Sequence, residues 1–389
     1  MNRPDLLDGF RDRRLAAALQ RRIAERASRL PRTPLTLMEV CGTHTVAIAR
    51  FGLRRLLPPA VRLVSGPGCP VCVTDAGFID AACELARRGM VLATFGDMLR
   101  VPGTAGSLAE ARAAGGDVRV CLSPLAALEW ARGEPGREVV LIAVGFETTT
   151  APLAAVVARA AAEGVRNLSL LTACKTMPAA LDALLRAPDV TVDGFLCPPH
   201  VSAIIGAAAY RPLAAAYRRP LVVAGFEPLD ILDGIDAVLA QAGRGAGEVE
   251  NRYTRVVHEN GNPVAQALVR AHLEPEDAAW RGLGVLPGSG LRLRPAFAAW
   301  DARVRHGIEV RPGKPAAGCR CGDVLRGRLD PGECALFGRA CTPASPVGPC
   351  MVSAEGSCAA RYRYDRAPAD GAPSHNGRTG RRKNGRQKR

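Results

Sequence analysis

The sequence predicts an α/β protein with two parallel-sheet βαβ domains around a cleft, plus a small irregular or helical C-terminal domain rich in cysteine. Short apolar runs alternate with Ala-rich helical stretches over most of the chain, as in parallel βαβ units. The runs end in glycine-rich or polar turns. After Leu286-Pro-Gly-Ser-Gly290 this alternation stops, and Pro, Gly and Cys dominate to about residue 364. A segment so poor in periodic apolar residues needs a source of stability other than an apolar core, and a bound metal cluster would supply it.

A helix is expected over 6–30, where Leu, Ala and Ile recur at helical spacing before Pro31. Eight apolar runs then predict strands: Leu35–Val40, Val61–Val64, Met90–Ala93, Val118–Leu122, Val139–Val144, Leu168–Leu171, Gly194–Leu196 and Leu221–Ala224. The expected organisation is an N-terminal helix at 1–30, an α/β domain with a thiol site at 31–132, a second α/β domain at 133–288, a cysteine-rich domain at 289–364 and a disordered basic tail at 365–389.

Composition narrows the class of protein. With 389 residues and 48% hydrophobic content, the chain can bury more than one core. We find no run of 18 apolar residues and no secretory signal, so we expect a cytoplasmic protein with no membrane role. In that reducing compartment, 13 cysteines favour metal binding or catalysis over disulfides. About half of the net charge of +15 comes from the seven Lys or Arg between Arg378 and Arg389, so no specific nucleic-acid partner is expected.

Cys41-Gly-Thr-His44 follows the first predicted strand, and ligands bind at the carboxyl ends of strands in parallel sheets. If the segment enters a helix, the thiol and the imidazole face the same side. His44 could then deprotonate Cys41, hydrogen-bond a ligand on a metal, or coordinate. A packed histidine at a capped helix start is the alternative interpretation.

Gly66-Pro-Gly68-Cys69-Pro-Val-Cys72 follows the second predicted strand and contains a CxxC pair. Two intervening residues let the sulfurs form a disulfide or share a metal, and a helix N-terminus lowers a thiol pKa. Gly66 and Gly68 would allow the backbone to approach a bound ligand closely. A buried cysteine pair in a glycine-rich turn is the structural alternative.

Two further loops at strand ends supply polar groups. Glu147, Thr148 and Thr149 offer a carboxylate and hydroxyls at a strand-to-helix turn, where capping alone would not require the carboxylate. Lys175 and His200 follow later strands and are candidates to line the same cleft.

The six C-terminal cysteines are separated by 1, 12, 6, 8 and 7 residues: Cys319, Cys321, Cys334, Cys341, Cys350 and Cys358. Four thiols at moderate separations in a Pro- and Gly-rich coil suit a [4Fe–4S] cluster. Zinc is the rival, although its sites usually come as two close pairs. We expect Cys334, Cys341, Cys350 and Cys358 to hold the cluster, which leaves Cys319 and Cys321 as a possible redox pair.

These motifs resemble those of the HypD family of hydrogenase maturation proteins. The resemblance covers roughly residues 15–364 and is carried by four motifs: Cys41-Gly-Thr-His44, Gly66-Pro-Gly-Cys-Pro-Val-Cys72, Gly145-Phe-Glu-Thr-Thr149 and the stretch from Cys341-Thr-Pro to Pro346-Val-Gly-Pro-Cys-Met-Val-Ser-x-Glu-Gly-x-Cys358. The basic tail lies outside it.

The resemblance implies a scaffold and redox protein on which the Fe(CN)2CO unit of [NiFe]-hydrogenase is assembled. It implies that Cys41 ligates the iron with His44 nearby, and that Cys69 and Cys72 form a dithiol or disulfide at the same cleft. A small HypC-type chaperone would share the iron, and a HypE-type protein would donate cyanide. A C-terminal [4Fe–4S] cluster would pass electrons to the cleft thiols.

Two other classes stay open. One is a [4Fe–4S]-dependent disulfide reductase resembling ferredoxin:thioredoxin reductase, which also combines a cluster with a CxxC. The other is a zinc-stapled RNA-binding protein that uses its basic tail.

Overall fold

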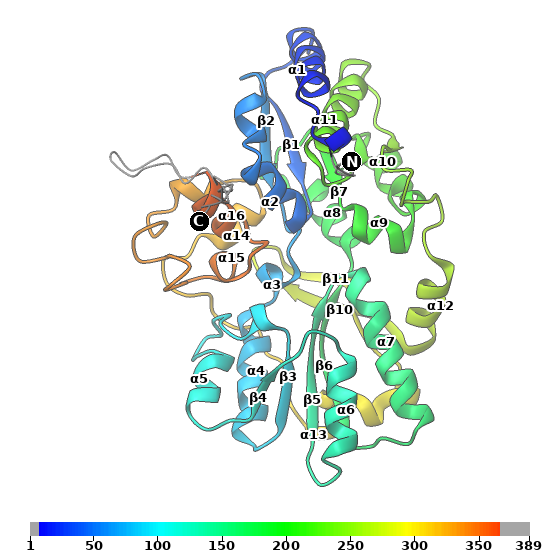
Figure 1. The fold of residues 1–389 in the computed structure, drawn as a ribbon, viewed down its shortest axis with the longest axis vertical. Coiled ribbons are helices and arrows are strands. Elements are labelled where there is room, and N and C mark those ends of the chain that lie inside the picture. The colour runs from blue at the N-terminus through cyan, green and yellow to red at the C-terminus, as the bar shows by residue number, and fades with distance from the viewer. Residues whose placement is uncertain (1–7, 366–389) are drawn as a thin grey trace, which may run out of the picture.

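The computed structural model describes residues 8–365, which form two α/β units placed end to end with a third, cysteine-rich part beside their junction (Figure 1). Residues 1–7 and most of the predicted basic tail, 366–389, lie outside the described residues. Within the described part, no helix combines the length and apolarity that crossing a bilayer requires.

Sheet A, in the upper unit of Figure 1, has five parallel strands in the order β2-β1-β7-β8-β9. Its strands are β1 Leu35–Glu39, β2 Val61–Ser65, β7 Gly194–Cys197, β8 Leu221–Val223 and β9 Val249–Asn251. Counted within the sheet, the order is 2-1-3-4-5. The direction of winding therefore reverses between β1 and β7, and ligands bind at such a switch point.

Sheet B, in the lower unit, has the order β10-β11-β6-β5-β3-β4. Its strands are β3 Val91–Thr94, β4 Val118–Val120, β5 Val139–Gly145, β6 Leu168–Lys175, β10 Leu273–Trp280 and β11 Gly284–Leu293. The four strands from β4 to β6 are parallel and repeat the order 2-1-3-4, whereas β11 and β10 extend the sheet antiparallel. A second switch point thus lies between β3 and β5.

Helices cover both sheets and connect most of the strands. The α-helices are α1 Arg13–Ser28, α2 Gly42–Arg50, α3 Pro70–Val73, α4 Ala76–Arg87, α5 Leu108–Ala113, α6 Leu125–Gly133, α7 Glu147–Ala162, α8 Met177–Arg186, α9 Pro199–Ile205, α10 Arg211–Tyr217, α11 Pro228–Gly243, α12 Pro263–His272, α13 Ala302–His306, α14 Cys321–Leu325, α15 Pro349–Val352 and α16 Ser357–Tyr364. Short 3-10 helices are η1 Asp8–Phe10, η2 Leu53–Leu56, η3 Gly96–Met98, η4 Ala207–Tyr210, η5 Pro295–Trp300 and η6 Pro331–Glu333.

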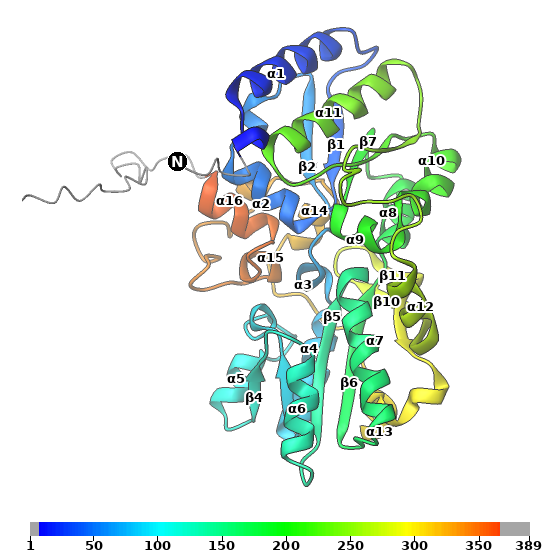
Figure 2. The ribbon, with the colours of Figure 1, turned by 45° about the vertical axis from the view of Figure 1, so that its right-hand side comes forward.

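The apolar cores explain why the parts hold together. One cluster lies between sheet A and helices α1 and α11, and a second lies between sheet B and helices α6 and α7 (Figure 2). The largest cluster joins Phe195 of sheet A and Val140 of sheet B to the thiols Cys72, Cys321 and Cys350. Both cysteine sets are therefore part of the core that links the two units.

The α/β prediction is confirmed, and all eight predicted strands are present as β1–β8. The N-terminal helix is shorter than expected, because Asp12 caps it and Arg13 is its first residue. Strands β9, β10 and β11 were missed. β10 and β11 carry Pro275 and Pro287, residues that sequence patterns treat as strand breakers.

The two sheets do not follow the expected boundary at residue 133. Sheet A takes strands from 35–65 and again from 194–251, and sheet B takes those from 91–175 and 273–293. The chain crosses between the units several times, and short apolar runs carry no signal of which sheet they enter. The expected C-terminal domain at 289–364 also begins later, because β11, η5 and α13 belong to sheet B.

Candidate functional site

Cys41 lies at the switch point of sheet A, directly after β1, and occupies the N-cap position of α2. Its side chain is buried, and the backbone N–H groups of His44 and Thr43 at the start of α2 act to lower the pKa of its thiol. Burial raises the pKa of the Cys41 thiol to about 12. The thiol is therefore protonated when no cation is bound, although the helix N-terminus is arranged to stabilise a thiolate.

The loop with the CxxC pair lies against Cys41. The Gly42 N–H donates to the Gly68 carbonyl at 3.0 Å. A β-carbon on Gly68 would lie 2.2 Å from the Cys41 nitrogen, so only glycine fits here. Gly66 is similarly close to the side chains of Met38 and Val40. The structure thus brings together the two motifs that the sequence assigned to one cleft.

Glu39, which sequence analysis missed, is buried beneath this loop. Its carboxylate accepts from the Cys41 N–H at 3.2 Å and from the Thr45 hydroxyl at 2.6 Å. Burial raises the pKa of Glu39 to about 7, and its charge in turn raises the pKa of Cys41. A glutamate inside an otherwise apolar strand run was the available signal.

His44 is completely buried and faces the loop after β8. Its Nε2 lies 2.9 Å from the Gly225 carbonyl and 3.1 Å from the Ala224 carbonyl, so Nε2 carries the proton and donates. Nδ1 has no hydrogen-bond partner within residues 8–365. Burial lowers the pKa of His44 to about 4, which leaves the ring neutral.

His200, at the start of helix α9 directly after β7, lies in the same region as His44. The ring centroid of Phe226 lies 4.3 Å from that of His200 and 5.5 Å from that of His44, so both histidines pack against the same aromatic ring. The loops after β1, β7 and β8 therefore converge, as expected at the carboxyl end of sheet A.

Cys69 and Cys72 occupy the N-cap and the third position of helix α3, which lies between the two units (Figure 1). The Cys72 N–H donates to the Cys69 sulfur at 3.2 Å, and both side chains are buried. Burial raises the pKa of the Cys72 thiol. In the described residues no disulfide joins Cys69 and Cys72, and all 13 cysteines are free thiols.

A continuous row of thiols leads away from Cys72. Cys72 has Cys69 and Cys350 as hydrogen-bonding neighbours, and Cys350 has Cys321 and Cys358. Cys321 has Cys319 as its next neighbour. The CxxC pair is thus connected through Cys350 to the C-terminal cysteines.

Five C-terminal cysteines line one cavity together with apolar side chains such as Leu336, Phe337 and Met351. The lining cysteines are Cys319, Cys321, Cys334, Cys341 and Cys358. Cys350 lies outside this lining, and its thiol has Cys321, Cys358 and Cys72 as neighbours. Within residues 8–365, no three His, Cys, Asp or Glu side chains converge as ligands of a single ion.

This cavity has features that fit an iron–sulfur cluster, in which each thiolate binds a different iron. The Val347 N–H donates to the Cys341 sulfur at 3.4 Å, a type of bond that stabilises cluster thiolates. Gly348 leaves room for the Cys319 sulfur, which would lie 2.5 Å from a β-carbon at that position. Apolar walls would exclude water from the cluster.

The cysteine-rich part also contacts the Cys41 loop directly. Glu355, in the turn between α15 and α16, accepts from the Thr43 hydroxyl at 2.8 Å. A β-carbon on Gly42 would lie 2.6 Å from that of Glu355. Helix α16 lies beside α2 (Figures 1 and 2). Glu355 was not predicted as a site residue, although it belongs to the last recognised motif.

Glu147, Thr148 and Thr149 follow β5 at the switch point of sheet B, where they diverge. Glu147 turns inward and accepts from the Met177 N–H at 2.9 Å, while its Oε2 has no partner within residues 8–365. Burial raises the pKa of Glu147 to about 7. Thr148 and Thr149 line a cavity of about 320 Å³ that also contains Pro70 and Asp97.

Asp97 is another residue that the sequence did not reveal. It follows β3, lines the cavity with Thr148 and Thr149, and accepts from the Ser353 hydroxyl at 3.5 Å. Burial raises the pKa of Asp97. The switch point of sheet B therefore opens beside the CxxC helix and the cysteine-rich part.

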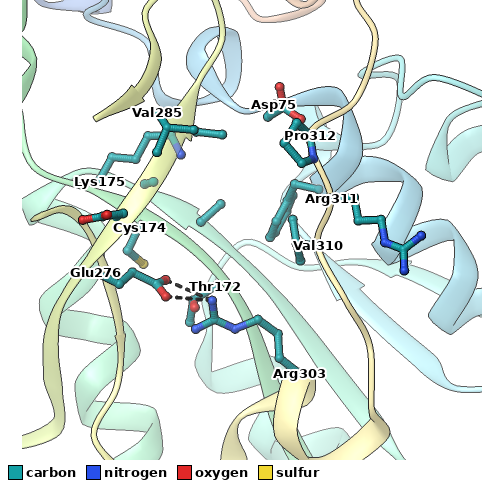
Figure 3. A pocket seen from close by; sticks show the side chains of 15 residues that line it. Asp75, Thr172, Cys174, Lys175, Glu276, Val285, Arg303, Val310, Arg311 and Pro312 are labelled. Carbon is teal, nitrogen blue, oxygen red and sulfur yellow. Dashed lines mark hydrogen bonds and ion pairs between the residues drawn. The ribbon is translucent and has the colours of Figure 1, made fainter. Parts of the chain in front are cut away.

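Lys175 lines a different cavity, of about 220 Å³, between β6 and the segment 310–312. In Figure 3 its side chain lies near Val285, with Cys174 below it and the Glu276–Arg303 ion pair across the cavity. Burial lowers the pKa of Lys175 to about 8. Lys175 is not among the residues that line the cavity at the switch point of sheet B, where Thr148 and Thr149 lie.

Comparisons with known proteins agree with this arrangement of motifs. The family model HypD, described as the hydrogenase formation hypA family, matches residues 14–365. The chain is 48% identical to the hydrogenase maturation factor HypD of Azotobacter vinelandii, over 92% of this chain and 97% of that protein. It is 44% identical to the HypD proteins of Cupriavidus necator and Escherichia coli K12, again over 92% of this chain and 97% of each relative.

Proposed function

Because this chain belongs to the HypD family of hydrogenase formation proteins, we propose that it is a scaffold and redox protein for assembly of the Fe(CN)2CO unit of [NiFe]-hydrogenase. Cys41 holds the iron, and the thiols behind it provide electrons. The observation that carries this proposal is the row of thiols that runs from the CxxC pair, whose loop packs on Cys41, through Cys72 and Cys350 to the cysteine-lined cavity.

Iron binding at Cys41 requires loss of the thiol proton, because burial holds the pKa of the free thiol at about 12. Fe(II) with cyanide and carbonyl ligands favours a soft thiolate, and its positive charge offsets the cost of ionisation. The Glu39 and Glu355 carboxylates both raise the pKa of the Cys41 thiol, so they also favour a cation there. The N–H groups of Thr43 and His44 then hold the thiolate in place.

One thiolate leaves most of the iron's coordination positions open. A HypC-type chaperone supplying a second thiol would meet that need, with a HypE-type protein donating the cyanide. The neutral Nδ1 of His44 has an unused lone pair, and its burial keeps it unprotonated at neutral pH. His44 therefore serves as an acceptor near the site rather than as a cation.

Release of cyanide from a protein thiocyanate takes two electrons and leaves a thiolate on the donor. Oxidation of the Cys69–Cys72 dithiol to a disulfide supplies two electrons and releases two protons. Cys350, next to Cys72, and Cys321, next to Cys350, form the pair that restores the dithiol by thiol–disulfide exchange. Cys321 has Cys319 as a neighbour too, but Cys350 is the C-terminal thiol that contacts Cys72. We therefore propose Cys350 and Cys321 in place of the pair expected from sequence, Cys319 and Cys321.

The lining of the cysteine cavity supports Cys319, Cys334, Cys341 and Cys358 as the residues that hold a [4Fe–4S] cluster. This set contains Cys319 in place of Cys350, because Cys319 lines the cavity and Cys350 does not. When bound, the cluster supplies single electrons to the thiol row.

Burial counts against the disulfide reductase as the main function. Cys69 is 4% exposed and Cys72 is 0% exposed, so the disulfide of another protein cannot reach either sulfur in this conformation. A small ligand on iron at Cys41 would already lie next to these two thiols, so it would not need access from outside the protein.

The test is the substitution Cys41→Ala, with Cys83→Ala as the matched control. Cys83 is a half-buried thiol on α4, outside the thiol row. Loss of Cys41 should abolish hydrogenase maturation while the brown absorbance of the cluster stays unchanged, and loss of Cys83 should affect neither. Normal maturation with Cys41→Ala would refute the proposed function.

A further inference from the structure

Arg281 lies between the two thiol-bearing parts of the protein. It directly follows β10, and its backbone N–H donates to the Val73 carbonyl at the end of α3, at 2.9 Å. Its Nε donates to the Thr74 carbonyl at 3.1 Å. The next residue, Gly282, packs on Gly322, whose Cα would lie 2.6 Å from a β-carbon at position 282. One short segment therefore touches both the CxxC helix and the residue that follows Cys321.

The charge of Arg281 is buried and lacks an acidic partner. The residue is 7% exposed, and its Nη2 has no hydrogen-bond partner in the described part of the chain. Over residues 8–365, its guanidinium also forms no ion pair with a carboxylate. Arginine stays protonated in proteins, and a buried permanent charge is costly unless an anion compensates it. Arg303, whose side chain is 25% exposed, shows the usual pattern, since it is paired with Glu276.

The cysteine cavity adjoins this segment, because Gly282 packs on Gly322, which directly follows the lining residue Cys321. The neighbouring Cys321 thiol and burial raise the pKa of Cys319, and the positive charge of Arg281 opposes that rise. Four cysteine thiolates around a [4Fe–4S] core give an assembly with a net negative charge, which grows by one when the cluster is reduced. A fixed positive charge in a region of low dielectric favours the more negative state.

We propose that Arg281 is the buried counter-charge of the cysteine-bound cluster and raises its reduction potential. The proposal rests on the proposed function, since it needs the cluster in the cavity of Cys319, Cys334, Cys341 and Cys358. Arg281 changes the reduction potential of the cluster through its positive charge, and it touches neither the iron at Cys41 nor the cyanide donor. A higher potential makes the cluster easier to load with an electron and lowers the driving force with which it reduces the thiol row.

The test is an anaerobic redox titration of the reconstituted full chain, followed by electron paramagnetic resonance of the reduced cluster. Arg281→Gln should lower the ratio of reduced to oxidised cluster at a fixed potential by about tenfold, equivalent to a midpoint about 59 mV lower for one electron. Arg281→Lys keeps the charge and should titrate close to wild type.

Arg320→Gln is the matched control. Arg320 lines the cysteine cavity, but its side chain is 55% exposed and paired with Asp323. Solvent screens such a charge, so the midpoint should move much less than in Arg281→Gln. A shift in Arg320→Gln as large as that in Arg281→Gln would overturn the proposal, because any nearby cation would then suffice.

Iron and sulfide content separates the remaining outcomes. A fully loaded Arg281→Gln variant with an unchanged midpoint overturns the proposal and leaves the proposed function intact, because Arg281 then only holds the Val73 and Thr74 carbonyls. If Arg281→Gln does not load, Arg281→Lys decides: a wild-type midpoint supports the proposal and a lowered one contradicts it. Wild-type protein that binds no iron and sulfide contradicts the proposed function itself.

Discussion

Replacing Gly68 by alanine tests how the two thiol motifs are held together. The added β-carbon would lie 2.2 Å from the Cys41 nitrogen, 2.4 Å from the Val40 carbonyl carbon and 2.5 Å from the Cys41 Cα. All three are backbone atoms, so no side-chain rotation can relieve the clash. Because ordinary contacts begin at 3.4 Å, the two loops must separate by about 1.2 Å (3.4 − 2.2).

That displacement has two expected consequences. Overpacking of this kind typically costs about 1–3 kcal/mol of stability. A reacting group misplaced by about 1 Å can cost about a hundredfold in rate. We therefore expect Gly68→Ala to fold with reduced stability, to keep its cluster and to mature hydrogenase at about 1% of the wild-type rate.

Urea unfolding, cluster absorbance and hydrogenase activity in a maturation assay measure these three properties. Gly136→Ala is the control, since a β-carbon there meets nothing within 4 Å and the residue has no positive φ. Wild-type maturation by Gly68→Ala would refute the reasoning that the close approach of these loops positions Cys41 beside the CxxC pair. Equal losses in both variants would refute it as well.

Three further predictions follow from the site. Glu355→Gln should lower the pKa of the Cys41 thiol, so alkylation of Cys41 by iodoacetamide should begin at lower pH than in the wild type. The same pH profile of Cys41 alkylation in both proteins would contradict an effect of the Glu355 charge on this thiol. Burial raises the pKa of Glu147 from 4.5 to about 7, so the folded state keeps a proton that the unfolded chain has lost, and stability falls as pH rises through this window. Glu147→Gln removes that loss, so its free energy of unfolding at pH 8, measured with urea, should exceed that of the wild type by about 1–3 kcal/mol. The same pH dependence of stability in both proteins would count against this reasoning. Cys358→Ser should lose cluster iron and sulfide while Cys350→Ser keeps both, and the reverse result would restore Cys350 as a ligand.

The strands were predictable because β1–β8 are short, apolar and bounded by turn residues. Their distribution over two sheets was not, because a parallel strand reads the same whichever sheet it joins. The hairpin of β10 and β11 was missed since Pro275 and Pro287 interrupt its pattern, and a bulge between Glu276 and Ala278 shifts its register.

The candidate site was partly predictable for a similar reason. Cys41 and Cys69 follow adjacent strands, β1 and β2, so their proximity follows from the sheet. Glu39, Asp97 and Glu355 were not predicted as site residues, because their roles depend on burial or on a contact with a residue far away in the chain. The roles of the C-terminal thiols also depend on tertiary contact, since spacing alone cannot show that Cys350 faces Cys72.

The most direct test of the account is infrared spectroscopy of the anaerobically purified chain in complex with a HypC-type partner. The account predicts nitrile and carbonyl bands from one iron in the wild-type complex. Those bands should vanish in Cys41→Ala while the sulfide content of the protein stays the same. Bands that persist without Cys41, or a loaded wild-type complex that shows none, would contradict the claim that the iron is assembled on this thiol.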